Sequence, residues 1–166
     1  MNEIEQIIEH LNLQPHPEGG YFKETYRSDS IIDQSQLNSN FSGDRNFSTA
    51  IYFLLTSDSF SAFHRIKQDE MWHYYKGSPL ELHIISKEGV YSKIKIGNDF
   101  EKGEVPQYVV KGGDYFAANV FNKNDYTLVG CTVSPGFDFM DFEMPNKEEL
   151  LKIFPDCSAI IDKLSN

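Results

Sequence analysis

The stretch FSAFHRIKQDEMWHYYKGSPLELHIIS, residues 60–86, decides the fold class. It contains three runs rich in aromatic and β-branched residues, at 60–66, 70–76 and 80–86. Side chains that alternate between two faces with a period of two are typical of β-strands. The turn at 77–79, Gly-Ser-Pro, separates the last two runs, because glycine and proline favour tight turns. The stretch therefore predicts short strands joined by tight turns.

The same pattern continues on both sides of this stretch. We expect an aromatic strand at 21–27 and further strands at 47–55, 90–96, 107–110, 114–119 and 126–133. Glycine, asparagine and aspartate mark the breaks between them. Such even spacing predicts an all-β sandwich or barrel.

Helices are expected only near the two ends of the sequence. One face of a short N-terminal helix is formed by Ile4, Ile7, Ile8 and Leu11. Near the other end, Asn146 followed by Glu149 is typical of a helix start, and a second short helix is expected from about Ser158.

The polar stretch 28–44 is expected to be a mobile loop, either a lid over a site or a plain solvated loop. No internal repeat or linker interrupts the sequence. We therefore expect a single domain over 1–166, with its core barrel at about 20–144 and a helical tail at 146–164.

Composition and charge exclude several classes of function. Of the 166 residues, 40% are hydrophobic and 24% are charged, which is typical of a folded globular domain. The net charge is −10 and no basic run offsets it, so we expect neither nucleic acid nor membrane partners. No secretory signal is recognised at the start, which favours a cytoplasmic protein. Cys131 and Cys157 lack redox or zinc spacing and are expected to be packed thiols.

His64 and Glu70 are the candidates for a site inside the barrel. In strand 60–66, alternation places His64 on the same face as Phe60, which we expect to point inward. Glu70 shares a face of the next strand with Trp72. A buried carboxylate beside a buried imidazole is costly unless the two pair with each other or with a metal. That cost indicates a functional site, while the alternative of His64 as a hydrogen-bonded core residue stays open.

The other histidines carry less functional weight. His73 falls on the opposite face of its strand from Glu70, so we expect a packing or interface role. Either face of its strand could hold His83, and a packing or surface role is preferred. His10 and His16 are expected at the surface.

The run from His64 to Gly77 resembles the first sequence motif of cupins, H-x-H-x₃-E-x₆-G. Its first histidine, glutamate and glycine fall on His64, Glu70 and Gly77. The second cupin motif, P-x-G-x₂-H, resembles residues 111–116. More specifically, the chain is similar to the cupin-5 family, also called domain of unknown function 985, in three blocks at 15–28, 69–83 and 128–144. The resemblance extends from 11 to 164.

This resemblance implies a jelly-roll barrel, or double-stranded β-helix, related in fold to dTDP-sugar epimerases and with a pocket in its mouth. Two metal-ligand positions of cupins differ here, because Ile66 and Phe116 replace histidines. His64 and Glu70 would need water or His83 to complete a metal shell. We therefore expect at most a weakly bound divalent metal and assign no other cofactor.

Three functions remain open for a small-molecule pocket. The first is an isomerase- or epimerase-like enzyme in which His64 is a general base oriented by Glu70, while Tyr74 or Tyr52 supplies a proton. The second is a non-catalytic module that binds a carbohydrate-like or planar ligand. The third is a metal-dependent oxygenase-type cupin that uses His64 and Glu70, and the missing ligands count against it.

Ligand contacts are expected from the first strand and from aromatic residues of the inner face. Glu24 lies in a stretch that resembles a substrate-contacting segment of the epimerases. The expected ligand-binding residues are Phe22, Glu24, Tyr26, Arg27, Tyr52, Trp72 and Phe116. Alternatively, the aromatic residues simply fill the barrel core. Only three arginines are present, which argues against a nucleotide-sugar, because diphosphates are bound by cationic side chains.

A homodimer is also expected. Strand 21–27 lies far in sequence from the barrel core and carries aromatic residues on both faces. Pairing with a neighbouring protomer would cover an open sheet edge. The related epimerases associate in this way.

Overall fold

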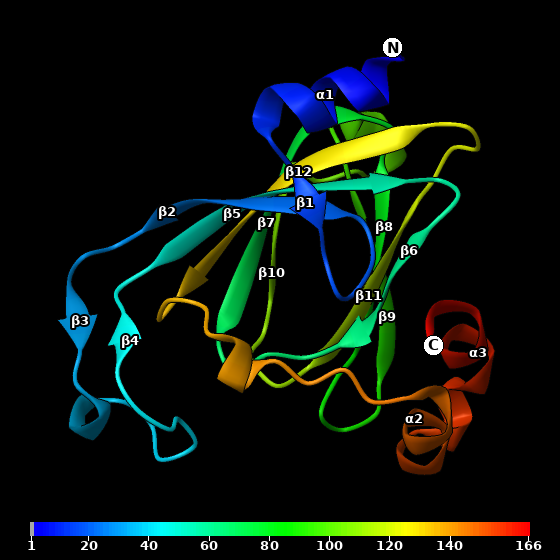
Figure 1. Cartoon of the computed structure of the whole chain (residues 1–166). Helices are drawn as coiled ribbons and strands as arrows, with labels where there is room; N and C mark the ends of the chain where they lie inside the picture. Colours follow the sequence, from blue (N-terminus) through cyan, green and yellow to red (C-terminus); the bar gives the residue numbers. More distant parts are fainter. Residues whose placement is uncertain (1) are drawn as a thin grey trace.

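The computed structural model describes residues 2–166 as two antiparallel β-sheets that pack against each other, with short helices near the ends of the chain (Figure 1). The larger sheet has the strand order β1 (Gln14–Pro15), β2 (Tyr21–Arg27), β5 (Thr49–Thr56), β12 (Tyr126–Ser134), β7 (Asp69–Gly77) and β10 (Gln107–Val110). The smaller sheet has the order β6 (Phe60–His64), β11 (Tyr115–Val120), β8 (Leu80–Ile85) and β9 (Tyr91–Ile96). The all-β class predicted from the alternation is confirmed.

The predicted strands agree with the structure to within one or two residues at each end. Three strands of two residues each, β1, β3 (Ile31–Ile32) and β4 (Arg45–Asn46), were not predicted from the sequence. Such short strands carry too few residues to display an alternating pattern.

The main core fills the space between the two sheets. Alternation along a strand sends every second side chain into this space, except where a bulge shifts the register. The buried residues that meet there from both sheets include Phe53, Leu55, Trp72, Leu82, Ile84, Phe116 and Val129. Aromatic and branched side chains therefore fill most of the barrel interior.

In β6 the pairing with β11 shifts between Ser61 and His64. Phe60, expected to point inward with His64, therefore packs on the outer face of the smaller sheet beside Phe63, and this expectation was wrong.

The helices cover the outer faces of the sheets. α1 (Glu3–Leu11) starts at a capping box between Asn2 and Glu5 and packs on the larger sheet. α2 (Lys147–Ile153) starts at the predicted capping box of Asn146 and Glu149, and with α3 (Ser158–Leu164) it covers the smaller sheet. Within the described residues no helix is both long and apolar enough to cross a bilayer.

Residues 28–47, here called the arm, extend away from the barrel (Figure 1). The arm contains the β3-β4 pair and a short 3₁₀ helix at Gln34–Gln36. Its buried Arg45 forms an ion pair with the equally buried Asp141, which comes from the segment after β12. The stretch expected to be a loop is thus attached to the barrel at its end.

Candidate functional site

One end of the barrel contains a cavity of about 320 Å³. The inner face of the larger sheet, the end of β6, the turn before β2 and the segment 136–142 enclose it. Most of its wall is apolar, and its largest side chains are Phe22, Phe53, Phe137, Phe139 and Phe142. The ionisable side chains in the wall are His16, Glu18, Glu24, Arg27, His64, Glu70, Cys131 and Asp138. A volume of this size holds a small organic molecule.

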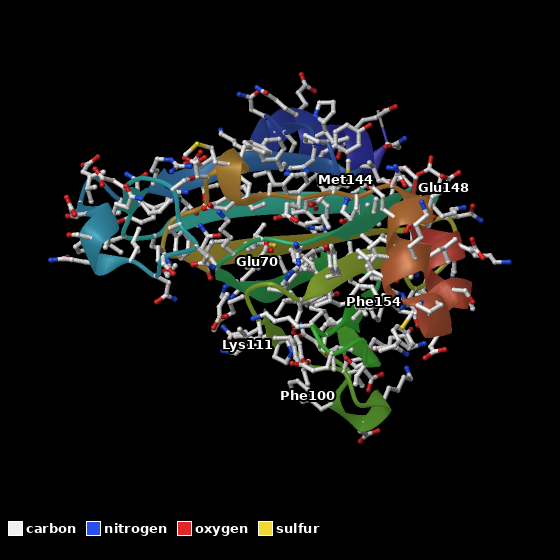
Figure 2. All side chains as sticks on the ribbon, turned by 90° about the horizontal axis from the view of Figure 1, so that it is seen from below. Glu70, Phe100, Lys111, Met144, Glu148 and Phe154 are labelled. Carbon is white, nitrogen blue, oxygen red and sulfur yellow. The ribbon has the colours of Figure 1, made fainter. Side chains whose placement is uncertain are left out.

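Five residues expected at the site line this cavity: Phe22, Glu24, Arg27, His64 and Glu70. Glu70 lies in the middle of the molecule between the two sheets, whereas Lys111 and Phe100 lie at its periphery (Figure 2). The polar residues of two distant segments, β2 and β6–β7, are therefore brought together.

A β-bulge decides which residues of β2 face the cavity. Strict alternation would send Tyr26 inward after Phe22 and Glu24. The register between β2 and β5 shifts between Glu24 and Tyr26, which inserts one extra residue, Thr25. As a result Arg27 points into the cavity and Tyr26 is 55% exposed. The expectation that Tyr26 lines the pocket is therefore corrected.

Four other expected residues lie away from the cavity wall. Tyr52 points to the outer face of β5, where it packs edge-on against Tyr75. Tyr74 points inward but lies far along β7, where its hydroxyl donates to the carbonyl of Gly77. Trp72 and Phe116 are sealed in the core and pack edge-on against each other. They support the cavity from beneath and do not border it.

Both ring nitrogens of His64 face hydrogen-bond acceptors. Nδ1 lies 2.7 Å from the carbonyl oxygen of Ala62, and Nε2 lies 2.8 Å from Oε2 of Glu18. A carbonyl and an ionised carboxylate only accept, so the ring carries protons on both nitrogens. Burial lowers the pKa of His64, but the charge and hydrogen bond of Glu18 outweigh it and the pKa is raised. Glu18, and not the expected Glu70, is thus the ion-pair partner of His64.

Glu18 reaches the cavity from the turn that precedes β2. Its carbonyl accepts a hydrogen bond from the Ala62 amide at 2.8 Å, which holds the turn against β6. Gly19 has a φ of +112°, and a Cβ there would lie 2.1 Å from the carbonyl oxygen of Phe60. Only glycine permits this close approach. Burial raises the pKa of Glu18, but the neighbouring His64 charge outweighs it and the pKa is lowered.

Sequence reasoning did not identify Glu18 as a site residue. A turn has no periodicity, so alternation could not place it in the barrel. The available signal was the Glu-Gly-Gly sequence at 18–20, inside the block at 15–28 that resembles the cupin-5 family.

Glu70 is a buried carboxyl group without a cationic partner. No ion pair among the described residues includes it, and its charge interaction with His64 is weaker than its repulsion from Glu18. Burial, together with that repulsion, raises the pKa of Glu70 to about 7. The adjacent Cys131 stays protonated, because burial raises its pKa well above the usual value, and it donates a hydrogen bond to Glu70. At neutral pH Glu70 therefore exists in both protonation states.

His16 was expected at the surface, and this prediction was wrong. Its side chain is only 8% exposed and lies among the rings of Phe22, Phe53 and Phe142. The Pro-rich turn folds back over the end of the barrel, so a residue outside any strand becomes part of the cavity wall. Burial lowers the pKa of His16 more than the negative charge of Glu18 raises it. The ring is therefore neutral at neutral pH.

Arg27 is paired with Glu24 at the exposed edge of the cavity. Its Nε donates to Glu24 at 2.6 Å, and its two terminal nitrogens donate to Asn46 and to the carbonyl oxygen of Phe137. The side chain therefore connects β2 to the segment 136–142 and is not free to bind an anion.

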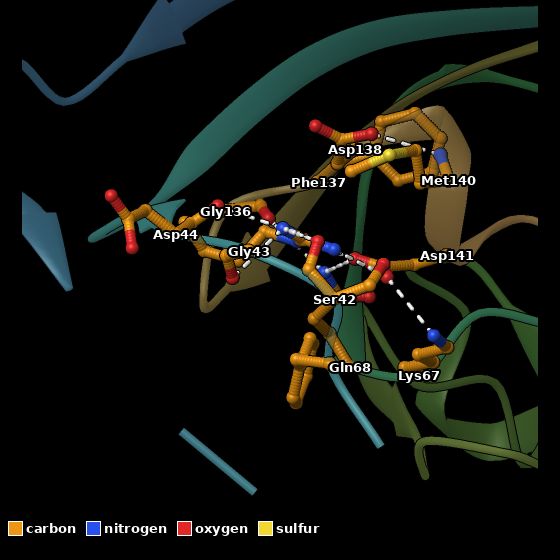
Figure 3. Close-up of polar contacts among 12 residues, drawn as sticks. Ser42, Gly43, Asp44, Lys67, Gln68, Gly136, Phe137, Asp138, Met140 and Asp141 are labelled. Carbon is orange, nitrogen blue, oxygen red and sulfur yellow. Dashed lines mark hydrogen bonds and ion pairs between the residues drawn. The ribbon is translucent and has the colours of Figure 1, made fainter. Parts of the chain in front are cut away.

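The aromatic side of the cavity is anchored from behind by Asp141. Its carboxylate accepts two hydrogen bonds from Arg45, each 2.8 Å long, and a third from Gln68 (Figure 3). Lys67 lies 3.5 Å from the same carboxylate. These contacts fix the segment 136–142, which carries Phe137, Phe139 and Phe142 into the cavity wall.

The residues present do not fit the divalent metal considered above. Both nitrogens of His64 are engaged, and Ile66 and Phe116 occupy the usual histidine positions. The described residues include no group of three or more His, Cys, Asp or Glu side chains arranged to hold a metal ion. We therefore assign no chemistry to a metal.

His73 and His83 lie outside the cavity, on the outer faces of the sheets. His73 interacts with Thr132 and Gln107 across neighbouring strands. His83 is buried between Tyr91 and Asn119, at 2.8 and 2.7 Å. Their positions agree with packing roles.

The first prediction concerns the pH dependence of stability. The folded state holds the Glu70 proton more tightly than the unfolded chain, so the free energy of unfolding falls as pH rises from about 4.5 to about 7. The pKa difference corresponds to roughly 3 kcal/mol. Glu70→Gln should remove this loss in denaturant unfolding at pH 5 and pH 8, whereas the exposed control Glu101→Gln should keep it. Equal pH dependence in wild type and Glu70→Gln would contradict the assignment.

The second prediction separates the two carboxylates near His64. Glu18→Gln should lower the pKa of His64 strongly, because Glu18 supplies the main stabilisation of the imidazolium, whereas Glu70→Gln should lower it less. NMR titration of the His64 ring in both variants measures this difference. An equal or larger effect of Glu70→Gln would show that Glu18 is not the principal partner.

Comparison with known proteins places the fold and the sequence in one family. The sequence matches the family described as Cupin superfamily (DUF985) over residues 5–145. An uncharacterized protein of Saccharomyces cerevisiae is 34% identical over 160 residues, which cover 91% of this chain and 79% of the yeast protein. A hypothetical protein from Leishmania major superposes with a TM-score of 0.90 and 38% identity, covering 99% of both chains.

More distant structures share the fold alone. Oxalate decarboxylase from Bacillus subtilis superposes with a TM-score of 0.54 and 13% identity, covering 90% of this chain and 36% of that one. The predicted jelly-roll barrel is thereby confirmed. The chain belongs to the Cupin_5 family of the cupin superfamily, also known as DUF985.

Proposed function

We propose that the cavity binds an uncharged small molecule and that Glu70 exchanges a proton with it near neutral pH, as in an isomerase- or epimerase-like enzyme. The observation that carries the proposal is the pKa of Glu70, about 7, in a carboxyl group that lines an apolar cavity. A proton-transfer group works best when its pKa lies near the working pH. Perturbed carboxyl groups in clefts are often functional.

In this proposal Glu70 replaces His64 as the general base. An imidazole acts as a base through a nitrogen that lacks a proton and faces the substrate. Both nitrogens of His64 instead face acceptors inside the protein, Ala62 and Glu18. His64 is better suited to holding Glu18 in its ionised form, and Glu18 in turn raises the pKa of Glu70.

The reaction requires no cofactor. The Glu70 carboxylate takes a proton from a carbon next to a carbonyl group, and the electron pair of the broken C–H bond moves toward the carbonyl oxygen to give an enolate. The Glu70 carboxylic acid then returns the proton to carbon, at another position of the intermediate or, after the intermediate has turned over in the cavity, on the opposite face of the same carbon.

The charges in the wall support an uncharged ligand. The cationic side chains pair internally, His64 with Glu18 and Arg27 with Glu24. An anionic ligand would therefore meet no unpaired cation, and the carboxylates in the cavity wall would repel it. A carbohydrate-like ligand remains one version of the proposal, although the phenylalanine rings offer few partners for its hydroxyl groups.

A non-catalytic binding module is the second candidate. The apolar wall alone would favour the binding of a small organic molecule, without any proton transfer. The two candidates differ in what they require of Glu70. Catalysis requires that the carboxyl group exchange a proton with the ligand, whereas binding requires only that it be accommodated.

The third prediction tests this difference. A thermal-shift screen with uncharged ketones, aldehydes and sugars should give compounds that raise the unfolding temperature. In D₂O, wild-type protein should catalyse deuterium incorporation beside the carbonyl of such a compound, and Glu70→Gln should be slower by about 100-fold or more. Proton NMR measures the exchange, with Glu101→Gln as control. Binding without exchange in wild type would exclude the enzyme and leave the binding module.

A homodimer is part of the proposal, and an open sheet edge supports it. On the side of β2 away from β5, β1 pairs only with Tyr21 and Phe22, so within the described residues no strand covers that edge from Lys23 to Arg27. Three large apolar side chains near this edge and on the arm are more than half exposed: Tyr26, Ile31 and Phe47. A second copy would cover both the edge and the arm.

The cytoplasmic location expected from the sequence stays a prediction.

The fourth prediction concerns this assembly. Light scattering of the wild-type protein at micromolar concentration should give twice the chain mass of 19.1 kDa. The double variant Ile31→Asp with Phe47→Asp should shift the protein to monomer, because it would bury charge at the contact. Val90→Asp, at an exposed site away from the arm, is the control. A wild-type monomer would contradict the proposal.

A further inference from the structure

We infer that the cavity takes an uncharged ketone or aldehyde with an apolar substituent, and that Nε2–H of His16 donates a hydrogen bond to its carbonyl oxygen. This inference rests on the proposed function and names its substrate class. It starts from the position of His16, whose role neither the alternation of the strands nor the cupin motifs indicated.

The backbone fixes the protonation pattern of the His16 ring. The Glu18 amide donates to Nδ1 of His16 at 3.2 Å, so Nδ1 must present a lone pair. A neutral imidazole with an unprotonated Nδ1 carries its proton on Nε2. His16 is therefore held as a neutral donor through Nε2.

The position of the ring assigns Nε2 of His16 to the cavity side. The ring is 8% exposed, and among the described residues Nε2 has no hydrogen-bond partner. Nε2 therefore lacks a partner but is not completely buried. The Nδ1 edge of the ring faces the Glu18 amide and the His16 side chain lines the cavity, and from these two contacts we infer that Nε2 points into the cavity. Nε2–H can therefore donate a hydrogen bond to an acceptor atom of a ligand.

His16 and Glu70 act on the same small volume. Oε2 of Glu18 lies 3.7 Å from Nδ1 of His16 and 2.8 Å from Nε2 of His64, and its charge also acts on Glu70. A neutral imidazole donor that polarises a carbonyl, combined with a carboxylate that removes the adjacent proton, is an effective arrangement for enolisation. As the C–H bond breaks, negative charge develops on the oxygen that His16 contacts.

The surroundings select the rest of the ligand. The centroid of the His16 ring lies 4.6 Å from that of Phe22, and the rings of Phe139 and Phe142 are also in contact with it. A carbonyl oxygen held by Nε2 would therefore have apolar groups on both sides. Acetophenone has this character, and α-methylstyrene has nearly the same shape without the oxygen.

These two compounds, with benzoate as the anionic counterpart, test the inference. Wild type should bind acetophenone about threefold to tenfold more tightly than α-methylstyrene, the ratio expected from one hydrogen bond. Benzoate should bind more weakly than acetophenone. His16→Leu should abolish the preference, His16→Gln should restore part of it through its amide donor, and the exposed-site control His10→Leu should retain it. NMR titration measures each affinity.

A second measurement does not depend on ligand. In ¹⁵N NMR at pH 7, His16 should show an unprotonated Nδ1 and a protonated Nε2, also in the Glu70→Gln variant. A cationic ring, or a proton on Nδ1, would overturn the inference, as would equal binding of the two probes or failure of wild type to bind either. If instead the carbonyl preference is found but Glu70 does not titrate near 7, the ligand class stands and the proposed proton transfer fails.

Discussion

The burial of Glu18, His64 and Glu70 in one small volume is the constraint on which the site depends. In a medium of low polarity, two neighbouring carboxylates and one imidazole cannot all adopt their usual protonation states. Glu18 and His64 form the ion pair, because they are 2.8 Å apart and His64 has a second acceptor at Ala62. Glu70 is left beside a carboxylate with no cation of its own, so it retains its proton up to neutral pH. The relative positions of the three side chains thus decide which of them are charged.

The fold explains why this constraint arises at one end of the barrel. Large apolar side chains, with Trp72 and Phe116 among them, fill the interior beneath the cavity. His64 stands at the end of β6 and Glu70 near the start of β7, so both lie where the packed core gives way to the opening. The turn that carries Glu18 closes over them, and Gly19 permits its approach to β6.

The sequence predicted the parts of the structure that depend on periodicity. Alternation placed the strands and sent Glu70 inward, because residues two apart in a strand share a face. His64 also faces inward, but a register shift in β6 turns Phe60, expected on the same face, to the outside. It misassigned Tyr26, because a one-residue bulge at Thr25 reverses the faces beyond it, and no residue type marks that bulge. It also missed Glu18 and His16, because their positions follow from how a turn packs on the barrel. These two polar residues of the cavity therefore depend on tertiary contacts that local sequence patterns do not encode.

The cavity keeps its structural charges apart from the polar groups that a ligand would meet. Asp141 and Arg45 fix the aromatic segment from behind, and Arg27 and Glu24 neutralise each other at its edge. A ligand would gain most of its affinity by burying apolar surface against the phenylalanine rings, which is not directional. Its orientation would then be set by the few polar groups that remain open, chiefly Glu70 and Nε2 of His16. Because an unmet buried polar group is costly, these two groups would discriminate against ligands that match the shape of the cavity but not its hydrogen bonds.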